Sequence, residues 1–247
     1  AKGRTKIRNA AKEPEITDLQ NFINSMGGKV HGAGSNTIVI DGVEDFHETE
    51  YTVIPDRIIA GTYLIAAAVT GSDMLVNNVN LEHIQALVNK LRETGCVITP
   101  LNGNQTGAVR VQAPQLLRAV ENTKTYPYPG FPTDMQALFM SALTVARGTS
   151  IITENIFENR FKHVPELIRM GANIRTEGRI AVIQGIPRLK GAEVSSGDLR
   201  GGAALVLAGL NAEGETIIDN IHHIGRGYDK LDEYLRSVGA DIVRLED

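Results

Sequence analysis

One sequence pattern occurs four times in this chain, and any fold must accommodate every copy. Each copy opens with a glycine and a short β-prone run, reaches an asparagine, and continues through a helical stretch to a second glycine. Similarity at a regular period indicates one supersecondary unit that is used repeatedly. The copies open at Gly3, Gly71, Gly148 and Gly214, and their second glycines are Gly27, Gly95, Gly171 and Gly239.

The helical stretch of each copy is predicted to be amphipathic, because apolar residues recur at the spacing of one helix face. In the first copy these residues are Leu19, Phe22, Ile23 and Met26. The second glycine suits a left-handed residue that ends a helix, and an extended run such as 36–43 follows it. Each copy therefore predicts a strand, a helix and two further strands.

Three of the copies are preceded by a second helix of a different kind. The segments 55–71, 133–148 and 197–214 are apolar nearly all round, which is typical of helices buried inside a domain. The predicted class is therefore α/β, with repeated βαβαββ units whose apolar helices are buried. Each of these helices is expected to start at an aspartate that could cap it, namely Asp56, Asp134 and Asp198.

The first copy has no such helix before it, and the polar stretch 44–55 separates it from the rest. We expect residues 1–53 to be the last part of one incomplete domain. Residues 54–247 would form a second domain of three units, which start at the buried helices near residues 56, 134 and 198. The chain opens without a methionine and runs at once into an apolar alternation, so we expect a fragment of a longer protein.

Composition narrows the class of protein further. The 247 residues carry a net charge of −4 and contain no long basic run, which argues against a general nucleic-acid or membrane surface. The longest apolar stretch, 63–69, is far too short to span a bilayer. A single cysteine excludes an internal disulfide, and no secretory signal opens the chain. We therefore expect a cytoplasmic protein.

The segment YPYPGFPTDMQAL, 126–138, makes the third copy different from the others, because a proline-rich approach leads to its aspartate. Asp134 could accept backbone N–H groups as a helix cap, as expected for Asp56 and Asp198. It could instead be a carboxylate that meets a substrate hydroxyl. The repeat favours capping, whereas the prolines found only in this copy favour a functional role, and the two roles are compatible.

Three arginines are candidates for an anion-binding site. Arg160 and Arg226 lie in the loop between strand and helix in the last two copies, where α/β proteins commonly bind ligands. Arg200 lies in the first turn of an apolar helix, and helix N-termini favour anions. Arginine can grip a carboxylate or a phosphate with two hydrogen bonds. A lone arginine would more simply form a surface ion pair, but three at matched positions predict an anion clamp.

Cys96 and the histidines are expected to be structural. The other copies have glycine or alanine at the position of Cys96, and a free cysteine commonly packs as a small apolar residue. His163, His222 and His223 lie near the arginine loops but lack metal-ligand spacing. We therefore expect no metal and no cofactor.

Six segments of the chain are NAAKEPEITDLQNF, PDRIIAGTYLIAAA, FPTDMQALF, FENRFKHVPELIRMGA, DLRGGAALVLAG and HIGRGYDKLDEYLRSVGADI. In this order they resemble the enolpyruvyl transferase family, in its branch that acts on UDP-N-acetylglucosamine. The resemblance implies an inside-out α/β barrel, and it covers only the C-terminal part of the family's length. In that family two domains of three such units enclose the active site in the cleft between them.

The resemblance implies transfer of the enolpyruvyl group of phosphoenolpyruvate to the 3-hydroxyl of UDP-N-acetylglucosamine, with release of phosphate. The matched catalytic positions are Asp134, as the base, Asp198 and Arg226. The matched substrate-binding positions are Asp134, Ile156, Arg160, Arg200 and Arg226. Glu158 and Asn159 would either order Arg160 or lie in a solvated loop. The implied partners are the two substrates and the N-terminal half of the same enzyme.

The family's reactive cysteine and its N-terminal lysine have no counterpart here, so we expect no turnover by this chain alone. Two alternatives stay open. One is a non-catalytic sugar-nucleotide-binding module of the same fold, and the other is the sister transferase of the shikimate pathway. An RNA-end cyclase is a weaker alternative, because binding a phosphate backbone needs several cations on one surface.

Overall fold

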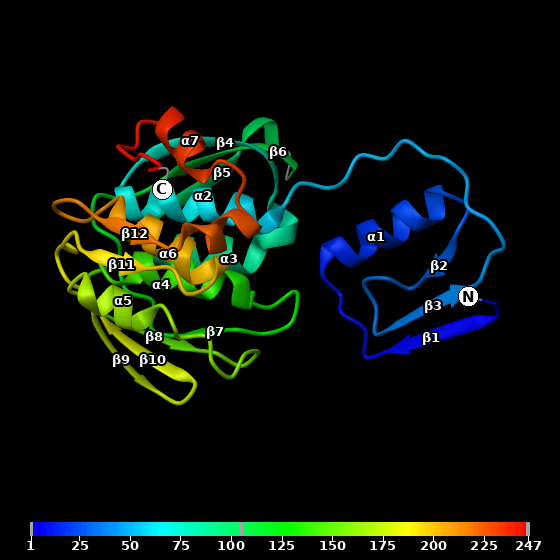
Figure 1. Cartoon of the computed structure of the whole chain (residues 1–247), viewed down its shortest axis with the longest axis horizontal. Helices are drawn as coiled ribbons and strands as arrows, with labels where there is room; N and C mark the ends of the chain where they lie inside the picture. The colour runs from blue at the N-terminus through cyan, green and yellow to red at the C-terminus, as the bar shows by residue number, and fades with distance from the viewer. Residues whose placement is uncertain (1, 104–105, 246–247) are drawn as a thin grey trace.

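A small N-terminal unit and a larger body make up the computed structural model, which describes residues 2–103 and 106–245 (Figure 1). The N-terminal unit is a three-stranded antiparallel sheet, ordered β1-β3-β2, with one helix against it. This is the strand, helix and two strands that the first copy predicts. Its elements are β1 (Arg4–Arg8), α1 (Pro14–Ser25), β2 (Lys29–His31) and β3 (Thr37–Asp41).

The larger body contains the other three copies. The second comprises α2 (Arg57–Thr70), β4 (Asp73–Asn80), η1 (Leu81–Ile84), α3 (Gln85–Glu93), β5 (Val97–Pro100), η2 (Leu101–Gly103) and β6 (Thr106–Gln112). The third comprises β7 (Thr123–Lys124), η3 (Thr133–Met135), α4 (Gln136–Leu143), β8 (Thr149–Thr153), α5 (Val164–Arg169), β9 (Asn173–Glu177) and β10 (Ile180–Gln184). The fourth comprises β11 (Glu193–Ser195), α6 (Leu199–Gly209), β12 (Ile217–Asp219), η4 (Ile221–Arg226) and α7 (Leu231–Ser237).

The apolar helices lie inside this body and the sheets lie around them. The sheets are ordered β4-β6-β5, β7-β8-β10-β9 and β11-β12. Every residue of α4 is buried, and α4 packs against both α2 and α6. Since these helices are apolar on nearly all sides, burying them is what removes their apolar surface from water. The predicted α/β arrangement with buried helices is thereby confirmed.

The copies are not identical in detail. The asparagine after the first strand adopts a left-handed conformation at Asn9, Asn78 and Asn220, but Asn155 is absent from this set. The β-prone run after Gly239 forms no strand between residues 240 and 245. A strand needs a neighbour to pair with, and the periodicity of one segment does not report whether that neighbour exists.

The expected caps are confirmed at two of the three buried helices. Asp56 Oδ1 accepts the N–H groups of Ile58 at 2.7 Å and Ile59 at 3.1 Å. Asp198 Oδ1 caps α6 in the same way. The prediction was wrong for Asp134, whose side chain accepts no capping hydrogen bond. That residue lies in the 3-10 turn η3, and α4 itself begins at Gln136.

Asp56→Ala is expected to lower the free energy of unfolding by about 0.5–2 kcal/mol, because two N–H groups at the start of a buried helix lose their acceptor. Asp56→Asn should retain most of the stability, since its amide oxygen can still accept. Urea unfolding followed by circular dichroism measures both. The exposed connector residue Asp45 supplies the control, Asp45→Ala. Equal stability of the Ala and Asn variants at position 56 would contradict the capping role.

The connector between the two parts is held by side-chain contacts. Tyr51 donates its hydroxyl to Asp18 Oδ1 at 2.7 Å, and its ring lies 5.3 Å from that of Phe22. Arg57 at the start of α2 forms two hydrogen bonds, 2.8 and 3.1 Å long, to the carboxylate of Glu15 in α1. The division of the chain into domains at about residue 53 stays a prediction.

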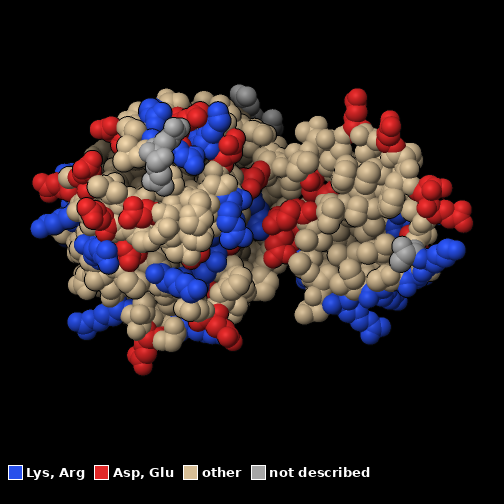
Figure 2. Space-filling model, viewed as in Figure 1, with Lys and Arg blue, Asp and Glu red and all other residues tan. Residues whose placement is uncertain are grey.

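The distribution of charge on the surface is relevant to the expectation that the protein binds neither nucleic acid nor a membrane. On the face shown in Figure 2, acidic and basic side chains of the larger body are interspersed rather than gathered into one basic area. Within residues 2–103 and 106–245, no helix combines the length and the apolar character needed to cross a bilayer.

Candidate active site

Asp134 joins two of the predicted arginines at the N-terminal ends of the buried helices. Arg160 donates from Nη2 to Asp134 Oδ1 at 2.7 Å. Arg200 donates from Nη2 to Asp134 Oδ2 at 3.2 Å. The two guanidinium side chains are only 16% and 15% exposed, whereas the carboxylate is 40% exposed. The carboxylate is therefore open to solvent, and a mostly buried arginine donates to each of its oxygens.

Arg200 is held from its other side by aromatic and hydroxyl groups. Its guanidinium carbon lies 5.7 Å from the centre of the Tyr228 ring, and the Tyr228 oxygen is 3.5 Å from its Nη1. The same hydroxyl lies 2.9 Å from Thr62 Oγ1 in the core of α2. Burial by itself lowers the pKa of Arg200, but the Asp134 carboxylate and the Tyr228 oxygen outweigh it and raise the pKa. Arg200 is therefore a fixed positive charge.

Arg160 comes from the loop between β8 and α5. Its guanidinium carbon lies 5.0 Å from the centre of the Phe157 ring. Its Nε is buried and has no hydrogen-bond partner in the described part of the chain. Behind it lies His163, a buried residue whose ring nitrogens likewise have none there. Arg160 thus depends on Asp134 as its counter-ion.

Arg226 does not join this cluster. It is exposed at the end of η4, and no ion pair or side-chain hydrogen bond of Arg226 occurs within residues 2–103 and 106–245. The segment that carries it packs against the first half of α6, where a Cβ added at Gly227 would meet Leu199 and one added at Gly202 would meet Ile224. Arg226 therefore lies on an element adjoining the helix that carries Arg200, and its side chain is exposed.

The other predicted residues have different surroundings. Asp198 caps α6 through Arg200 N and Gly201 N, at 3.0 and 2.9 Å. The side chain of Ile156 is 39% exposed. Glu158 is exposed and lies 3.8 Å from Arg179 Nη2, and Asn159 is exposed too. The possibility that Glu158 orders Arg160 is therefore not supported, and the solvated-loop interpretation holds.

Sequence reasoning missed Glu154, a carboxylate that is 1% exposed. It follows β8 directly, and its hydrogen bonds reach both ends of the proline-rich loop as well as the loop that leads to Arg160. Nothing in the chain distinguishes it locally, because Asp219 precedes the asparagine of the fourth copy in the same way and is exposed. Its donors are Thr125 Oγ1 at 2.7 Å, Ile156 N at 2.8 Å, Phe157 N at 3.0 Å and Thr133 Oγ1 at 3.0 Å.

Cys96 and the paired histidines take no part in the arginine cluster. Cys96 is 3% exposed and lies beside Thr94, and burial raises the pKa of its thiol. A raised pKa keeps the thiol protonated and therefore unreactive. His222 and His223 stack with ring centres 4.1 Å apart. Among the described residues, no group of three or more His, Cys, Asp or Glu side chains could hold a metal ion.

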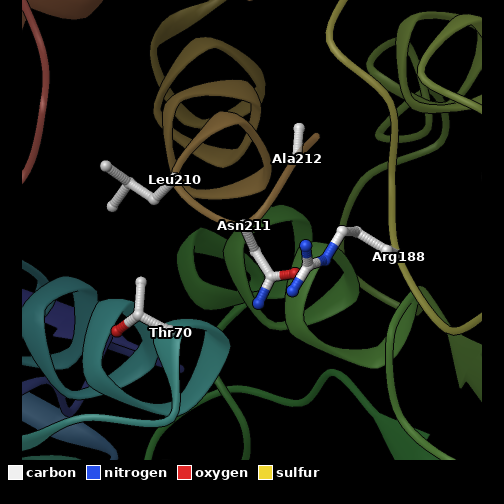
Figure 3. A pocket seen from close by; sticks show the side chains of 5 residues that line it. All are labelled: Thr70, Arg188, Leu210, Asn211 and Ala212. Carbon is white, nitrogen blue, oxygen red and sulfur yellow. The ribbon is translucent and has the colours of Figure 1, made fainter. Parts of the chain in front are cut away.

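Two hollows lie near the buried helices. One of about 290 Å³ is at the end opposite the arginines, where α2 and α6 finish, and Figure 3 shows the side chains of Arg188 and Asn211 pointing toward one another in it. The other, of about 330 Å³, shares Tyr228 with the cluster, and burial raises the pKa of its wall residue Tyr63 to about 12. It is lined by Ile59, Tyr63, Gly227, Tyr228, Asp229 and Tyr234.

Comparison with known proteins identifies the family. Residues 1–235 match the family model described as EPSP synthase (3-phosphoshikimate 1-carboxyvinyltransferase). The chain belongs to this family. Family members share the arrangement of sheets around buried helices: the enolpyruvyl transferase NikO from Streptomyces tendae superposes with a TM-score of 0.85 at 26% identity, over 98% of this chain and 57% of that one.

Several relatives that match nearly the whole chain carry the same name. "UDP-N-acetylglucosamine 1-carboxyvinyltransferase 2" of Caldanaerobacter subterraneus subsp. tengcongensis is 56% identical over 99% of this chain. A UDP-N-acetylglucosamine 1-carboxyvinyltransferase of Trichlorobacter lovleyi is 52% identical over the whole chain. The chain spans 58% of the length of each of these relatives. The EPSP synthase of Acinetobacter baumannii, at 19% identity and a TM-score of 0.72, shares the fold.

Proposed function

We propose that this chain is the C-terminal part of a UDP-N-acetylglucosamine 1-carboxyvinyltransferase. Such an enzyme transfers the enolpyruvyl group of phosphoenolpyruvate to the sugar 3-hydroxyl and releases phosphate, a cytoplasmic step of peptidoglycan precursor synthesis. The names of the relatives at 52–56% identity support the substrates. The observation that carries the proposal is the Asp134 carboxylate, which contacts two recessed arginines instead of capping its helix.

Asp134 would be the base that takes the proton of the sugar 3-hydroxyl. A base must reach the proton that it removes, and this carboxylate is exposed to solvent at 40%. A capping aspartate would instead have its oxygens occupied by backbone N–H groups. The absence of capping bonds at Asp134 leaves the carboxylate available for a substrate.

Arg160 and Arg200 would bind the anionic groups of phosphoenolpyruvate or of the sugar nucleotide. Both guanidinium groups face the same carboxylate, so the cluster carries more positive than negative charge. An incoming carboxylate or phosphate can replace Asp134 at the arginines, because arginine binds either group with two hydrogen bonds. The replacement would release Asp134 toward the hydroxyl. Arg226, which has no ion pair within residues 2–103 and 106–245, would contribute a further cation.

Asp198 would act by fixing the first turn of α6, from which Arg200 projects. Its carboxylate accepts the backbone N–H of Arg200 itself, at 3.0 Å. Ile156 would present its backbone to the sugar nucleotide at the start of the loop that carries Arg160. Neither role needs a metal or a cofactor.

The test compares two proteins. One is this chain alone, and the other is this chain fused behind the N-terminal part of the 56% identical Caldanaerobacter relative, which we call the joined enzyme. With UDP-N-acetylglucosamine and phosphoenolpyruvate, we expect the joined enzyme to release phosphate and the chain alone to release none. Turnover by the chain alone would show that the N-terminal part is dispensable.

Two further outcomes would favour the alternatives. If the folded joined enzyme binds UDP-N-acetylglucosamine without releasing phosphate, a non-catalytic binding module is the better description. If it turns over 3-phosphoshikimate instead of the sugar nucleotide, the protein belongs with the sister transferase. Binding is measured by calorimetry and folding by circular dichroism, so that a misfolded fusion is recognised.

A further inference from the structure

We propose that Glu154 is a positioning residue for Asp134 and for the loop that carries Arg160. The inference rests on the proposed function, since it concerns the same site. Glu154 and its hydrogen-bonding partners Thr125, Thr133, Ile156 and Phe157 are called the Glu154 clamp below.

The clamp joins three segments that are separate in the sequence. Oε2 of Glu154 accepts from Thr133 Oγ1 at 3.0 Å, and Thr133 directly precedes Asp134. Oε1 accepts from the backbone N–H groups of Ile156 at 2.8 Å and Phe157 at 3.0 Å. These two residues begin the loop that ends at Arg160. One buried carboxylate therefore connects the residue before the proposed base with the loop that supplies its cationic partner.

The proline-rich loop is fixed at both ends by the same carboxylate. Thr125, at the start of the loop, donates to Oε1 of Glu154 at 2.7 Å. The loop also closes on itself, since the N–H of Tyr126 donates to the carbonyl of Phe131 at 3.0 Å. Prolines limit the backbone freedom of the residues between these two ends. The position of Asp134 is therefore determined mainly by where the two threonines are held.

The third copy differs from the others at this place. After the first strand, the other copies have a left-handed asparagine, at Asn9, Asn78 and Asn220. In the third copy, Asn155 instead donates its backbone N–H to Thr125 Oγ1 at 2.8 Å, next to the clamp. This is also the copy with the prolines and with the uncapped aspartate. The change from a left-handed turn to a carboxylate clamp thus occurs only where the proposed base lies.

Because Glu154 is buried, its carboxylate requires hydrogen-bond donors from the protein. A carboxylate that is 1% exposed is stable only when its oxygens are hydrogen-bonded, and here charge-assisted bonds satisfy both of them. Within the described residues, no hydrogen bond joins a clamp atom to the Asp134 carboxylate. Glu154 would therefore act through Thr133 and the loop backbone, and not by touching the substrate.

The first measurement uses the chain by itself and does not depend on catalysis. Amide hydrogen exchange at Ile156 and Phe157 is expected to accelerate at least about tenfold in Glu154→Ala, because both N–H groups lose a charged acceptor. Thr133→Val removes only the Oε2 contact, so exchange at these two amides should stay at the wild-type rate. Unchanged exchange in Glu154→Ala would overturn the clamp itself.

The second measurement uses the joined enzyme. We expect Glu154→Gln and Thr133→Val to lower kcat about 10–100-fold, because a misplacement of about 1 Å costs that much. Glu166→Gln is the matched control, since Glu166 Oε2 accepts the N–H of Ser195 at 3.0 Å outside the cluster. The kcat of Glu166→Gln should equal that of the wild type. Its melting temperature measures how much stability is lost when a carboxylate that binds a backbone N–H is replaced outside the cluster.

The comparison separates positioning from stability. If the kcat of Glu154→Gln and Thr133→Val matches that of Glu166→Gln, the positioning role is overturned. The same conclusion follows if kcat recovers when all proteins are assayed well below their melting temperatures. If the wild-type joined enzyme gives no turnover, the proposed function fails instead, and the exchange rates still decide whether the clamp exists.

Discussion

Asp134→Asn in the joined enzyme is expected to lower kcat by about 10²–10⁴-fold, the usual contribution of a general base. The amide cannot take the hydroxyl proton, and it offers no negative charge to Arg160 and Arg200. The free energy of unfolding should change by only about 1 kcal/mol, because the carboxylate is 40% exposed and its ion pairs are screened by water. Phosphate release and urea unfolding measure the two effects.

The matched control is another aspartate in an ion pair. Asp73 binds Arg110 through two hydrogen bonds of 2.8 and 2.6 Å on an exposed part of the surface. Asp73→Asn removes an equivalent charge far along the sequence from the cluster and should leave kcat unchanged. If Asp134→Asn kept its activity and changed only the melting temperature, the carboxylate would be structural, and the proposed base would have to be sought elsewhere.

The buried helices were predictable because their signal is local. A helix that is apolar on all sides has to be surrounded by other elements, whatever those elements are. The caps Asp56 and Asp198 follow from the same local rule. Asp134 has the sequence position of a cap, but it does not act as one in the structure. It lies in a 3-10 turn, and α4 starts only at Gln136. An aspartate at the expected start of a buried helix therefore had two different outcomes.

The contacts that distinguish Asp134 are distant in the sequence. Arg160 is 26 residues away and Arg200 is 66 residues away. The repeat predicted that both arginines lie where a helix begins or where a strand leads into a helix. It therefore indicated that they lie on the same side of the larger body, but it did not indicate which carboxylate they would contact. Arg226 occupies the same position in its copy and meets none within the described residues. The repeat pattern thus predicts the region in which an arginine side chain lies. Its ion-pair partner depends on how distant segments pack together.

Glu154 shows a second limit of sequence reasoning. A glutamate is usually exposed, and only the positions of Thr125, Thr133 and the following loop make burial of this one tolerable. The strand expected after Gly239 does not form within the described residues 240–245, and a strand needs a neighbouring strand to pair with. Both features depend on neighbours that no single segment of the chain specifies.

His163 is expected to make the stability of the chain strongly dependent on pH. Its ring is buried without a hydrogen-bond partner among the described residues. Burial lowers the pKa of His163 from 6.5 to about 4; the charge of Arg160 adds to this shift, while the Asp198 carboxylate and the backbone of Arg160 oppose it. In the unfolded chain the imidazole would titrate near its ordinary pKa. The folded chain thus binds this proton only at lower pH.

The direction of the effect follows from proton binding. Between pH 6.5 and 4 the unfolded chain takes up a proton at His163 that the folded chain refuses, so acidification favours unfolding. Above pH 6.5 the residue contributes no pH dependence, and below about pH 4 the loss is complete. At about 1.4 kcal/mol for each pH unit, the total loss amounts to roughly 3 kcal/mol.

The test is urea unfolding of this chain at a series of pH values between 7.5 and 4. Buried carboxylates also contribute to acid unfolding, so the difference between wild type and His163→Leu isolates the histidine. His222→Gln is the control, because His222 is exposed and should leave the wild-type profile intact. We expect the profile of His163→Leu to be flatter by roughly 3 kcal/mol across this window. Parallel profiles would mean that the pKa of His163 in the folded chain stays near its ordinary value, which would contradict the expected pH dependence.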